Sequence, residues 1–484
     1  MGNALRLFNT LTRSKEEFKP IQPPQVGLYT CGPTVYGYQH LGNYRTYIFE
    51  DILKRTLILL GYRVRHVMNI TDVGHLTSQA DEGEDKIEKS ARREGKSAWE
   101  LSRFYTDAFL KDSRDLALSP PEVLCRATDH IPEQIDLVRR LEAKGCLYKT
   151  SDGLYFDSAK FAEYGRLAGG SLEGPARGRI AQNPEKRAAA DFAVWKFSIP
   201  KGLRQMEWNS PWGVGFPGWH IECSAMSMKY LGESFDIHAG GVDHIPVHHT
   251  NEIAQSQAAT GKPLARFWAH GEFLVLNDSK MAKSEGTGIT VEGLKNRGFS
   301  PLDYRYHALT VHYRKQLDFT WDSLEASKKA RARLREIAAE LAKKEAHPRP
   351  IIPPREGGVG REAPSEGGAA STAAADLKSA FTERLSDDLD APGALAFLWE
   401  TLRKDIPAPA KLKILEASES VFNLGIFDKE VPLELPKEAA ALIDRRARAR
   451  AARDYALSDQ IRESLGRLGI AVEDTPEGQK WRKA

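Results

Sequence analysis

The sequence predicts an α/β protein built on a doubly wound, Rossmann-type parallel sheet. A strand–helix–strand pattern runs from Val26 to Thr71, with the turn-rich loop CGPTVYGYQHLGN between its first strand and its helix. Alternating strands and helices return between Trp219 and Leu276. Two half-sheets separated by a stretch of mixed periodicity are typical of a doubly wound fold with an inserted subdomain. Helical patterns fill most of the remaining chain, so an all-α helical region and a small C-terminal domain are expected to follow.

Changes in composition mark the boundaries between the expected segments. A Gly-rich stretch, GGSLEGPARGR, lies in the insertion, and residues 347–376 are rich in Pro, Gly, Ser and Ala, which predicts a flexible linker. The expected order is a first half of the sheet domain at 1–130, a connective insertion at 131–205, the second half at 206–278, a loop and helical junction at 279–346, the linker at 347–376, a helical bundle at 377–430 and a C-terminal domain at 431–484.

Apolar periodicity predicts the individual elements within these segments. Residues 1–25 are expected to be an extension that leads into the first strand, and 81–118 has a charged helical pattern. The second half should contain a helix over Trp219–Leu231, a strand over Phe235–His238, a turn at Gly240-Gly241 and a helix from about His248 to Ala259. Later helices are expected over 299–319, 377–404 and 409–422.

Bulk composition limits the class of protein. The 484 residues are too many for one ordinary core, and the net charge of +3 is mild, so any surface that binds nucleic acid must be a local patch. No apolar run approaches the roughly 18 residues of a membrane span, and no signal peptide is evident, which predicts a cytoplasmic protein without membrane contact. The four cysteines form no CxxC pair, which argues against a disulfide framework or a zinc ribbon.

Two loops are candidates for binding phosphate groups. In an open parallel sheet, ligands bind beyond the carboxyl ends of the strands, which is where the loop from Cys31 to Asn43 is expected to lie. This loop lacks GxGxxG and GxxxxGK[ST], but His40 opens a helix and can donate to phosphate oxygens, and Gly42 lets a nucleotide base approach closely. Alternatively, His40 is structural or solvated, as most histidines near helix starts are. The second loop, KMAKS at 280–284, follows an apolar strand-like run.

Four residues are candidates for a metal site. His248 and Glu252 are four apart in an expected helix and therefore project from one face. Cys31 is expected at a strand end and Cys223 inside a helix. Two thiolates, one imidazole and one carboxylate suit tetrahedral zinc. Each residue alone also has a simpler interpretation, because cysteines are often small buried hydrophobes and His/Glu pairs are common surface contacts.

Longer motifs give the chain a family resemblance. The segments YTCGPTVYGYQHLGN, MNITDVGH, GWHIECSAM, FDIHAGG, HHTNEIAQ, KMAKS and GIAVEDTPEGQKWR occur in this order over nearly the whole chain. They resemble the cysteinyl-tRNA synthetase family, and the loops at His40 and KMAKS resemble the His-Ile-Gly-His and Lys-Met-Ser-Lys-Ser signatures of class I aminoacyl-tRNA synthetases.

The resemblance implies a zinc ion that selects the amino acid. It implies one Zn²⁺ per chain, which also binds the thiolate of the substrate cysteine. The implied ligands are Cys31, Cys223, His248 and Glu252, and the residues implied to shape the cysteine pocket are Thr71, Trp219 and His238. Serine differs from cysteine by one atom, and its hydroxyl is a much poorer zinc ligand, so such a site can reject serine without editing.

The implied reaction is that of a cysteine–tRNA ligase. ATP binds together with Mg²⁺. The cysteine carboxylate attacks its α-phosphorus, which releases pyrophosphate and leaves cysteinyl-adenylate. The cysteinyl group then passes from the adenylate to the terminal ribose of tRNA(Cys). The residues expected to act in catalysis are His40, Asn43, Lys280 and Lys283. Those expected to bind ATP are Gly42, Gly240, Gly241, Asp243 and Lys283. Positioning and charge stabilisation dominate such phosphoryl displacements.

Two signature positions depart from the family pattern. Asn43 replaces the second histidine of the first signature, and Ala282 replaces the middle serine of the second. Asparagine keeps a hydrogen-bond donor and Ala282 spares both lysines, so we expect reduced or retuned activity rather than none.

The C-terminal region is expected to bind the anticodon. By resemblance, the contacting residues are Arg450, Asp459, Asp474 and Trp481, and an arginine-rich run beside them is a candidate surface for phosphates. A small core tryptophan and solvated charges are the alternative interpretation. The protein is expected to be a monomer. Two other functions stay open at this point: a ligase that joins cysteine to an amino-sugar acceptor, and a catalytically silent tRNA-binding paralogue.

Overall fold

The computed structural model describes residues 4–73, 76, 85–169, 183–198, 204–276, 279–280, 288–346, 366–428, 437–468, 470–475 and 478–483. The chain separates into two compact units, one of residues 1–291 and 301–426 and the other of residues 292–300 and 427–484. Among the helices in the described ranges, none is both long and apolar enough to cross a membrane.

The core of the first unit is a five-stranded sheet in which all neighbouring strands are parallel. In spatial order, its strands are β12 (Ala265–Gly271), β11 (Phe235–Gly241), β3 (Gln25–Thr30), β4 (Arg63–Ile70) and β5 (Val123–Arg126). The strand that follows β3 in the chain lies on one side of it, and β11 lies on the other. This change of direction confirms the predicted doubly wound fold and places the ligand crevice at the carboxyl ends of β3 and β11.

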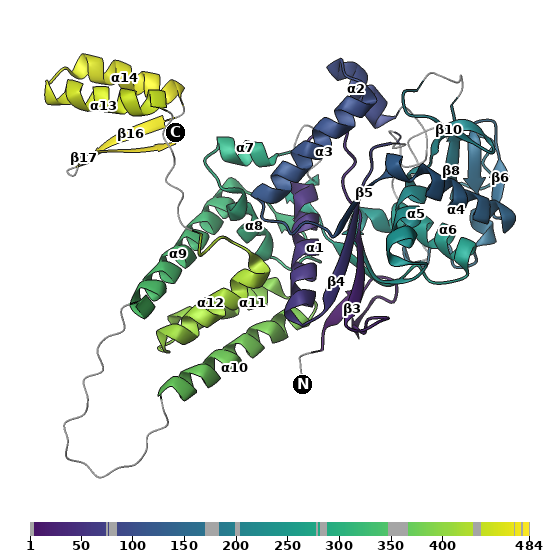
Figure 1. Ribbon diagram of the computed structural model, residues 1–484, viewed down its shortest axis with the longest axis horizontal. Coiled ribbons are helices and arrows are strands. Elements are labelled where there is room, and N and C mark those ends of the chain that lie inside the picture. Colours follow the sequence, from purple (N-terminus) through teal and green to yellow (C-terminus); the bar gives the residue numbers. More distant parts are fainter. Residues whose placement is uncertain are drawn as a thin grey trace, which may run out of the picture. The chain divides into compact units, whose positions relative to one another are not determined.

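Helices pack on this sheet, and α1 (Leu41–Leu59) runs beside β4 (Figure 1). Phe49 and Leu53 of α1 share a buried cluster with Leu28 of β3. Tyr29, the next residue of β3, points to the opposite face because side chains alternate along a strand. There α5 (Trp219–Leu231), which the sequence predicted with these bounds, packs against β3 and β4.

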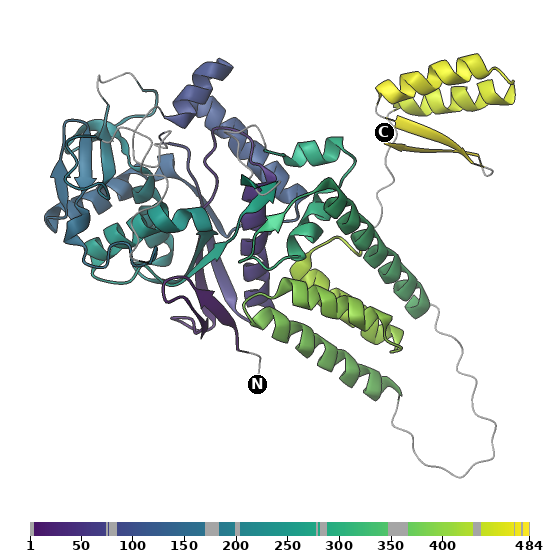
Figure 2. The same cartoon turned by 180° about the vertical axis from the view of Figure 1, so that it is seen from behind.

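A second sheet of five antiparallel strands, which Figure 2 shows from behind, spans residues 147–217 and so extends past the end expected for the insertion at 205. Its strands, in spatial order, are β6 (Leu147–Lys149), β7 (Gly153–Phe156), β8 (Phe192–Phe197), β10 (Gly213–Pro217) and β9 (Trp208–Ser210). Besides α1 and α5, the α-helices described up to residue 260 are α2 (Lys86–Glu94), α3 (Ala98–Asp115), α4 (Ile131–Ala143) and α6 (Thr250–Thr260). An N-terminal hairpin of β1 (Arg6–Asn9) and β2 (Ser14–Glu17) forms within the extension expected at 1–25.

Two elements around the site differ from the prediction. Gly240 and Gly241 do not form a turn but are the last residues of β11, where they pair with His270 and Gly271 of β12. The helix expected from about His248 to Ala259 is present as α6, but a π-helical turn over Ile245–His249, which we did not predict, precedes it. Glycine resembles a turn signal in sequence, yet here the missing side chain of Gly240 leaves room for the rings of His244 and His249.

Helices and a small sheet follow. The expected helix over 299–319 divides into α8 (Pro301–Leu309) and β15 (Leu317–Asp318), which pairs with β13 (Leu274–Leu276), itself paired with β14 (Ser279–Lys280). The later helices are α9 (Trp321–Ala346), α10 (Glu366–Ser386), α11 (Ala391–Arg403) and α12 (Ala408–Phe422). Residues 366–376 are helical rather than linker because their alanines favour a helix, and 347–365 lie outside the described residues. The helix expected over 377–404 is broken at Asp388 and Leu389, which have φ of 62° and 55°.

The second unit contains two helices and a hairpin at its C-terminal end. These are α13 (Lys437–Ala451), α14 (Tyr455–Arg467), β16 (Ile470–Thr475) and β17 (Gly478–Lys483), while α7 (Val291–Asn296) lies near the junction of the two units in the sequence. Ala439, Ile461 and Leu465 are among the buried residues that hold the two helices together.

Candidate metal centre and nucleotide site

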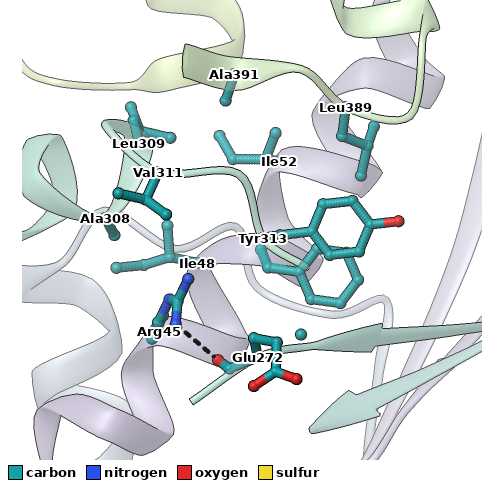
Figure 3. Close-up of a pocket in the computed structure, with 12 residues that line it drawn as sticks. Arg45, Ile48, Ile52, Glu272, Ala308, Leu309, Val311, Tyr313, Leu389 and Ala391 are labelled. Atoms are coloured by element: carbon teal, nitrogen blue, oxygen red, sulfur yellow. Dashed lines mark hydrogen bonds between the residues drawn. The ribbon is translucent and has the colours of Figure 1, made fainter. Parts of the chain in front are cut away.

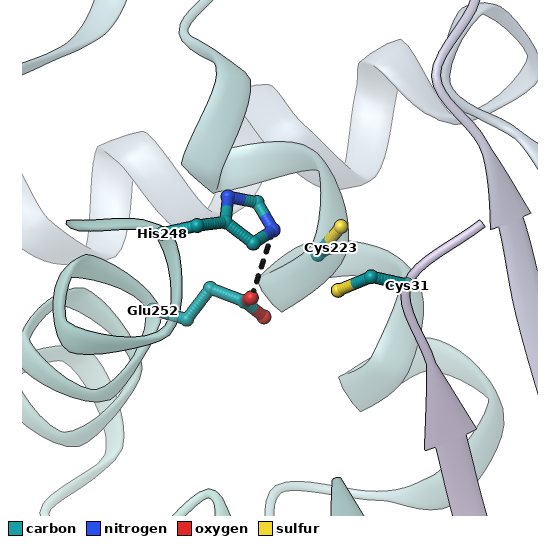
Figure 4. Close-up of side chains that lie close together, drawn as sticks. All are labelled: Cys31, Cys223, His248 and Glu252. Carbon is teal, nitrogen blue, oxygen red and sulfur yellow. Dashed lines mark ion pairs between the residues drawn. The ribbon is translucent and has the colours of Figure 1, made fainter. Parts of the chain in front are cut away.

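Four donor side chains from distant parts of the sequence meet at the carboxyl edge of the parallel sheet (Figure 4). Cys31 follows β3, Cys223 lies in α5, His248 lies in the π-helical turn and Glu252 in the first turn of α6. One donor atom from each lies within 4.8 Å of the others, and all four residues are buried. We call these four residues the donor cluster. His248 enters the donor cluster from a π-helical turn, and such turns often occur at functional sites.

Electrostatic interactions within the donor cluster favour the charged forms of Cys223 and His248. Burial raises the pKa of the Cys223 thiol, but the hydrogen bond with Cys31 and the nearby His248 outweigh it and bring this pKa to about 6. Burial lowers the pKa of His248, yet Glu252 and Cys223 raise it to about 10. Burial and the neighbouring Cys223 raise the pKa of Cys31 well above its usual value. The cluster therefore holds a thiolate at neutral pH, with Cys31 as the hydrogen-bond donor to it.

The donor set fits a zinc ion by its chemistry. Two sulfurs, one imidazole nitrogen and one carboxylate oxygen are ligands that tetrahedral zinc accepts. His248 Nδ1 lies 2.9 Å from His220 Nδ1, and Glu252 Oε2 lies 3.0 Å from His238 Nε2. Such outer hydrogen bonds orient the ligands of protein metal sites. These side chains thus have the chemistry of zinc ligands and of the partners that orient such ligands.

Three further histidines lie beside the donor cluster: His249 and His270, which are buried, and His244, which is half-buried. His249 Nε2 lies 3.4 Å from Cys31 Sγ, and its Nδ1 lies 2.7 Å from His270 Nε2. Burial lowers the pKa of His249 and of His270 well below the usual value, and it lowers the pKa of His244 to about 4. These three rings are therefore neutral at neutral pH and do not repel a cation. Cys31, His238, His249 and Glu252 form a second group whose donor atoms lie within 4.8 Å of one another.

The residues expected in the cysteine pocket lie beside the donor cluster. The Trp219 ring stacks on His248 with ring centres 4.4 Å apart. Thr71 directly follows β4, and its Oγ1 accepts a hydrogen bond of 3.0 Å from Asn69 Nδ2. The loop after Cys31 packs tightly here, because a Cβ on Gly32 would lie 1.7 Å from the carbonyl oxygen of Asn69. His220 and His249 belong to the same region, and the sequence analysis missed them; their only signal was adjacency to Trp219 and His248.

His40 and Asn43 form a reciprocal cap at the start of α1. The Asn43 backbone N–H donates to His40 Nδ1 over 3.3 Å, and the His40 backbone N–H donates to Asn43 Oδ1 over 3.2 Å. Because Nδ1 accepts a hydrogen bond, the neutral ring carries its proton on Nε2. Gly42 is required for this arrangement, since a Cβ there would lie 2.9 Å from His40 Nδ1. The backbone N–H of residue 43 thus orients the imidazole, and the Asn43 side chain, where the sequence departs from the signature, accepts from the His40 backbone.

The chain that follows the lysine signature returns to His40. The backbone N–H of Leu41 donates to the carbonyl of Ile289 over 2.8 Å, and His40 forms a β-bridge with Thr290. Lys280 lies in β14, and its side chain lies outside the described residues, as do Ala282 and Lys283.

Gly240, Gly241 and Asp243 lie at or just beyond the carboxyl end of β11, as expected for residues near the ligand edge. A Cβ on Gly241 would lie 2.5 Å from Asp243 Oδ1, and one on Gly240 would lie 2.7 Å from His244 Nδ1. Close packing within the chain therefore accounts for both glycines. A role for them in admitting a ligand stays a prediction.

Residues predicted to contact the anticodon form ion pairs with other side chains of the second unit. Arg446 donates to both oxygens of Asp474 at 3.0 and 2.9 Å, and Arg450 pairs with the same carboxylate at 3.0 Å. Asp459 is exposed and lies 3.4 Å from Arg462. Trp481 lies in β17 opposite Val472, and its side chain lies outside the described residues. Asp474 thus joins α13 to the hairpin. Its main partner is Arg446, a member of the arginine-rich run that was expected to be exposed and is instead buried.

Two family models match this chain. The model described as tRNA synthetases class I (C) catalytic domain matches residues 17–329. The model described as cysteinyl-tRNA ligase anticodon binding domain matches residues 433–482.

Curated relatives match over nearly the full length. A protein named cysteine–tRNA ligase 1 from Burkholderia lata is 49% identical over 98% of this chain and 96% of the relative. Proteins named cysteine–tRNA ligase from Treponema denticola and Thermus thermophilus are 44% and 42% identical, each over 99% of this chain and at least 99% of the relative. A solved methionyl-tRNA synthetase from Mycobacterium tuberculosis, with methionyl-adenylate, superimposes with a TM-score of 0.57 at 16% identity over 90% of this chain and 96% of that one. This last likeness concerns the fold alone.

Proposed function

The chain belongs to the cysteine–tRNA ligase family of class I aminoacyl-tRNA synthetases, and from this membership we propose which residues perform each step. Its function is that of a cysteine–tRNA ligase, the ATP-dependent attachment of cysteine to tRNA. The observation that carries our residue assignments is the convergence of Cys31, Cys223, His248 and Glu252 within 4.8 Å at the ligand edge of the sheet.

The first proposed assignment is recognition of the cysteine side chain. The donor cluster holds one Zn²⁺ per chain, with Cys223 as the ready thiolate and His220 and His238 bonded behind the ligands. When bound, zinc supplies a ligand position that a thiolate fills and a serine hydroxyl fills poorly. Trp219, stacked on His248, and Thr71 enclose the same region and orient the substrate.

The second proposed assignment is activation by ATP, which binds with Mg²⁺. The substrate carboxylate attacks the α-phosphorus, and pyrophosphate leaves. His40, with its proton on Nε2 at the positive end of α1, donates to the phosphates, and the Asn43 backbone N–H bonded to Nδ1 holds that ring in place. Lys280 and Lys283 balance the negative charge on the leaving group, and Gly42, Gly240, Gly241 and Asp243 surround the nucleoside.

Metal content and pyrophosphate exchange test these assignments together. We expect one zinc per purified chain and cysteine-dependent ATP–pyrophosphate exchange, with serine at least roughly 1,000-fold less effective in kcat/KM, because a site built around the distinguishing atom rejects the isostere strongly. Zinc content is measured by mass spectrometry of the protein and exchange by labelled pyrophosphate. A zinc-free chain with full discrimination would contradict the assignment of the metal.

The third proposed assignment is recognition of tRNA(Cys) by the second unit. Residues 433–482 match the anticodon-binding model, and Arg445 and Arg448 are exposed on α13. A ligase for an amino-sugar acceptor would not need such a domain, and a silent paralogue would not need the donor cluster, so neither alternative explains the whole chain. The monomeric state and the cytoplasmic location stay predictions.

Neutralising the exposed face of α13 should weaken tRNA binding specifically. For Arg445→Ala combined with Arg448→Ala, we expect the salt dependence of log Kd for tRNA to lose about one unit of slope per phosphate contact removed. Cysteine-dependent pyrophosphate exchange should stay at the wild-type rate. Arg63→Ala, which removes an exposed arginine at the start of β4, is the matched control. An unchanged salt slope in the double variant would place the phosphate contacts elsewhere.

A further inference from the structure

Arg45 of α1 is a buried cation whose hydrogen-bond acceptors are main-chain carbonyls. It lies five residues after His40, and only 4% of it is exposed. Figure 3 shows its side chain reaching toward the main chain of Glu272, beside a cavity that Tyr313 and Leu389 also line. The guanidinium donates to the carbonyl oxygens of Glu272 at 3.0 Å, of His312 at 3.5 Å, and of Phe273 and Lys315. One side chain thus joins α1 to two separate segments.

Both of these segments lead into the small sheet that carries the lysine signature. Glu272 and Phe273 come directly before β13, which pairs with β14 so that Val275 lies opposite Lys280. His312 and Lys315 belong to the turn before β15, the other neighbour of β13. Arg45 therefore fixes both segments that enter this sheet with reference to α1, the helix that His40 opens.

A second group of contacts holds the same turn from its other side. Tyr313 OH and Arg314 Nε donate to the Asp388 carboxylate at 2.7 and 2.8 Å, and His312 Nε2 donates to its carbonyl at 2.9 Å. Asp388 is only 1% exposed and lies at the corner between α10 and α11. The turn is thus held between Arg45 on α1 and Asp388 on the helical bundle.

We propose that Arg45 is a positioning residue for ATP binding. It fixes the main chain of Lys280 relative to His40, so that both signatures contact the triphosphate of one ATP. This inference rests on the ATP contacts assigned above. The two signatures lie about 240 residues apart in the sequence, so their separation must be fixed by contacts of this kind. A misplacement of about 1 Å between groups that hold one substrate can cost roughly 100-fold in rate.

Arg45→Lys is the most informative substitution at this position because lysine keeps the positive charge. Its single ammonium cannot match the planar fork with which arginine reaches four carbonyls in two segments. For Arg45→Lys we expect KM for ATP to rise about tenfold in pyrophosphate exchange, an effect of partial misplacement, while KM for cysteine stays within about twofold because the donor cluster is untouched. Arg45→Met should raise KM for ATP further.

Asp388→Asn tests the same turn from the opposite side. Asparagine tolerates the positive φ at this position but cannot pair ionically with Arg314, so we expect a smaller rise in KM for ATP with KM for cysteine unchanged. Arg331→Lys is the matched control. Arg331 donates to the Leu424 carbonyl at 2.7 Å and pairs with Asp303, and its loss should lower the melting temperature without moving either KM.

The outcomes distinguish a failure of this inference from a failure of the ATP contacts on which it rests. A rise in KM for ATP alone in Arg45→Lys and Asp388→Asn, but not in Arg331→Lys, supports it. A lower melting temperature in Arg45→Lys with both KM values at wild type would show a merely structural arginine and overturn it. Equal rises in both KM values would overturn it as well. The ATP assignments fail separately, through a folded His40 variant with wild-type exchange kinetics.

Discussion

Cys223→Ala should lose its zinc and its ability to prefer cysteine over serine. Cys223 is one of the two sulfur donors of the cluster; burial raises the pKa of its thiol, but Cys31 and His248 bring it to about 6. Without it, Cys31 loses the anion to which it donates, and only one sulfur is left in the donor cluster. We expect kcat/KM for cysteine to fall at least roughly 100-fold, or about 2.7 kcal/mol of transition-state stabilisation. Metal analysis and cysteine-dependent pyrophosphate exchange on the same sample measure both effects.

Cys125→Ser is the matched control for that experiment. Cys125 is also buried, at 3% exposure, and lies in β5 of the same sheet, but it is not part of the donor cluster. This variant should keep one zinc per chain and most of its activity. If Cys223→Ala also retained its zinc, the second group of Cys31, His238, His249 and Glu252 would be the binding site, and the proposed ligand set would be wrong.

The sequence predicted those parts of the fold in which apolar residues repeat locally. The helix over Trp219–Leu231 and the first strand–helix–strand unit both show clear periodicity, and the structure confirms both. The extension of β11 through Gly241 was missed because glycine has no side chain to continue an apolar pattern. The corner at Asp388 was missed for another reason: its positive φ is held by contacts with Tyr313 and Arg314, which no local pattern records.

The donor cluster shows the same limit in the functional site. Spacing linked only His248 with Glu252. The two cysteines were candidates because of their expected places at a strand end and inside a helix, and the family resemblance implied that all four form one set. The structure brings the four donors together because β3, α5 and α6 meet at one sheet edge. His220 and His249 could not be predicted, because a second buried histidine beside a ligand has no pattern of its own. Arg45 is a similar case, since its acceptors are main-chain carbonyls and carry no residue identity.

His40→Asn should separate the chemical role of His40 from its role as a helix cap. Asparagine is a good N-cap residue, so the thermal stability of α1 should stay within about 0.5 kcal/mol of wild type. The imidazole donor is lost, however, and a preorganised donor to developing phosphate charge is worth roughly 100-fold to 1,000-fold in kcat. We therefore expect pyrophosphate exchange to fall by at least about 100-fold in a protein that melts almost normally.

Asn43→Ala is the complementary variant, because it removes the side chain that accepts from the His40 backbone but keeps the imidazole. Here the helix should lose about 1 kcal/mol of stability, while kcat should fall less than about tenfold, because the Asn43 backbone N–H still bonds His40 Nδ1 and so keeps the proton on Nε2. Melting curves and exchange rates of both variants show whether His40 acts only as a helix cap or also donates to phosphate. If His40 acts only as a cap, Asn43→Ala would be the slower enzyme. If His40 donates to phosphate, the order is reversed, and Asn43 supports the cap at His40 without taking over the role of the second histidine, which this chain lacks.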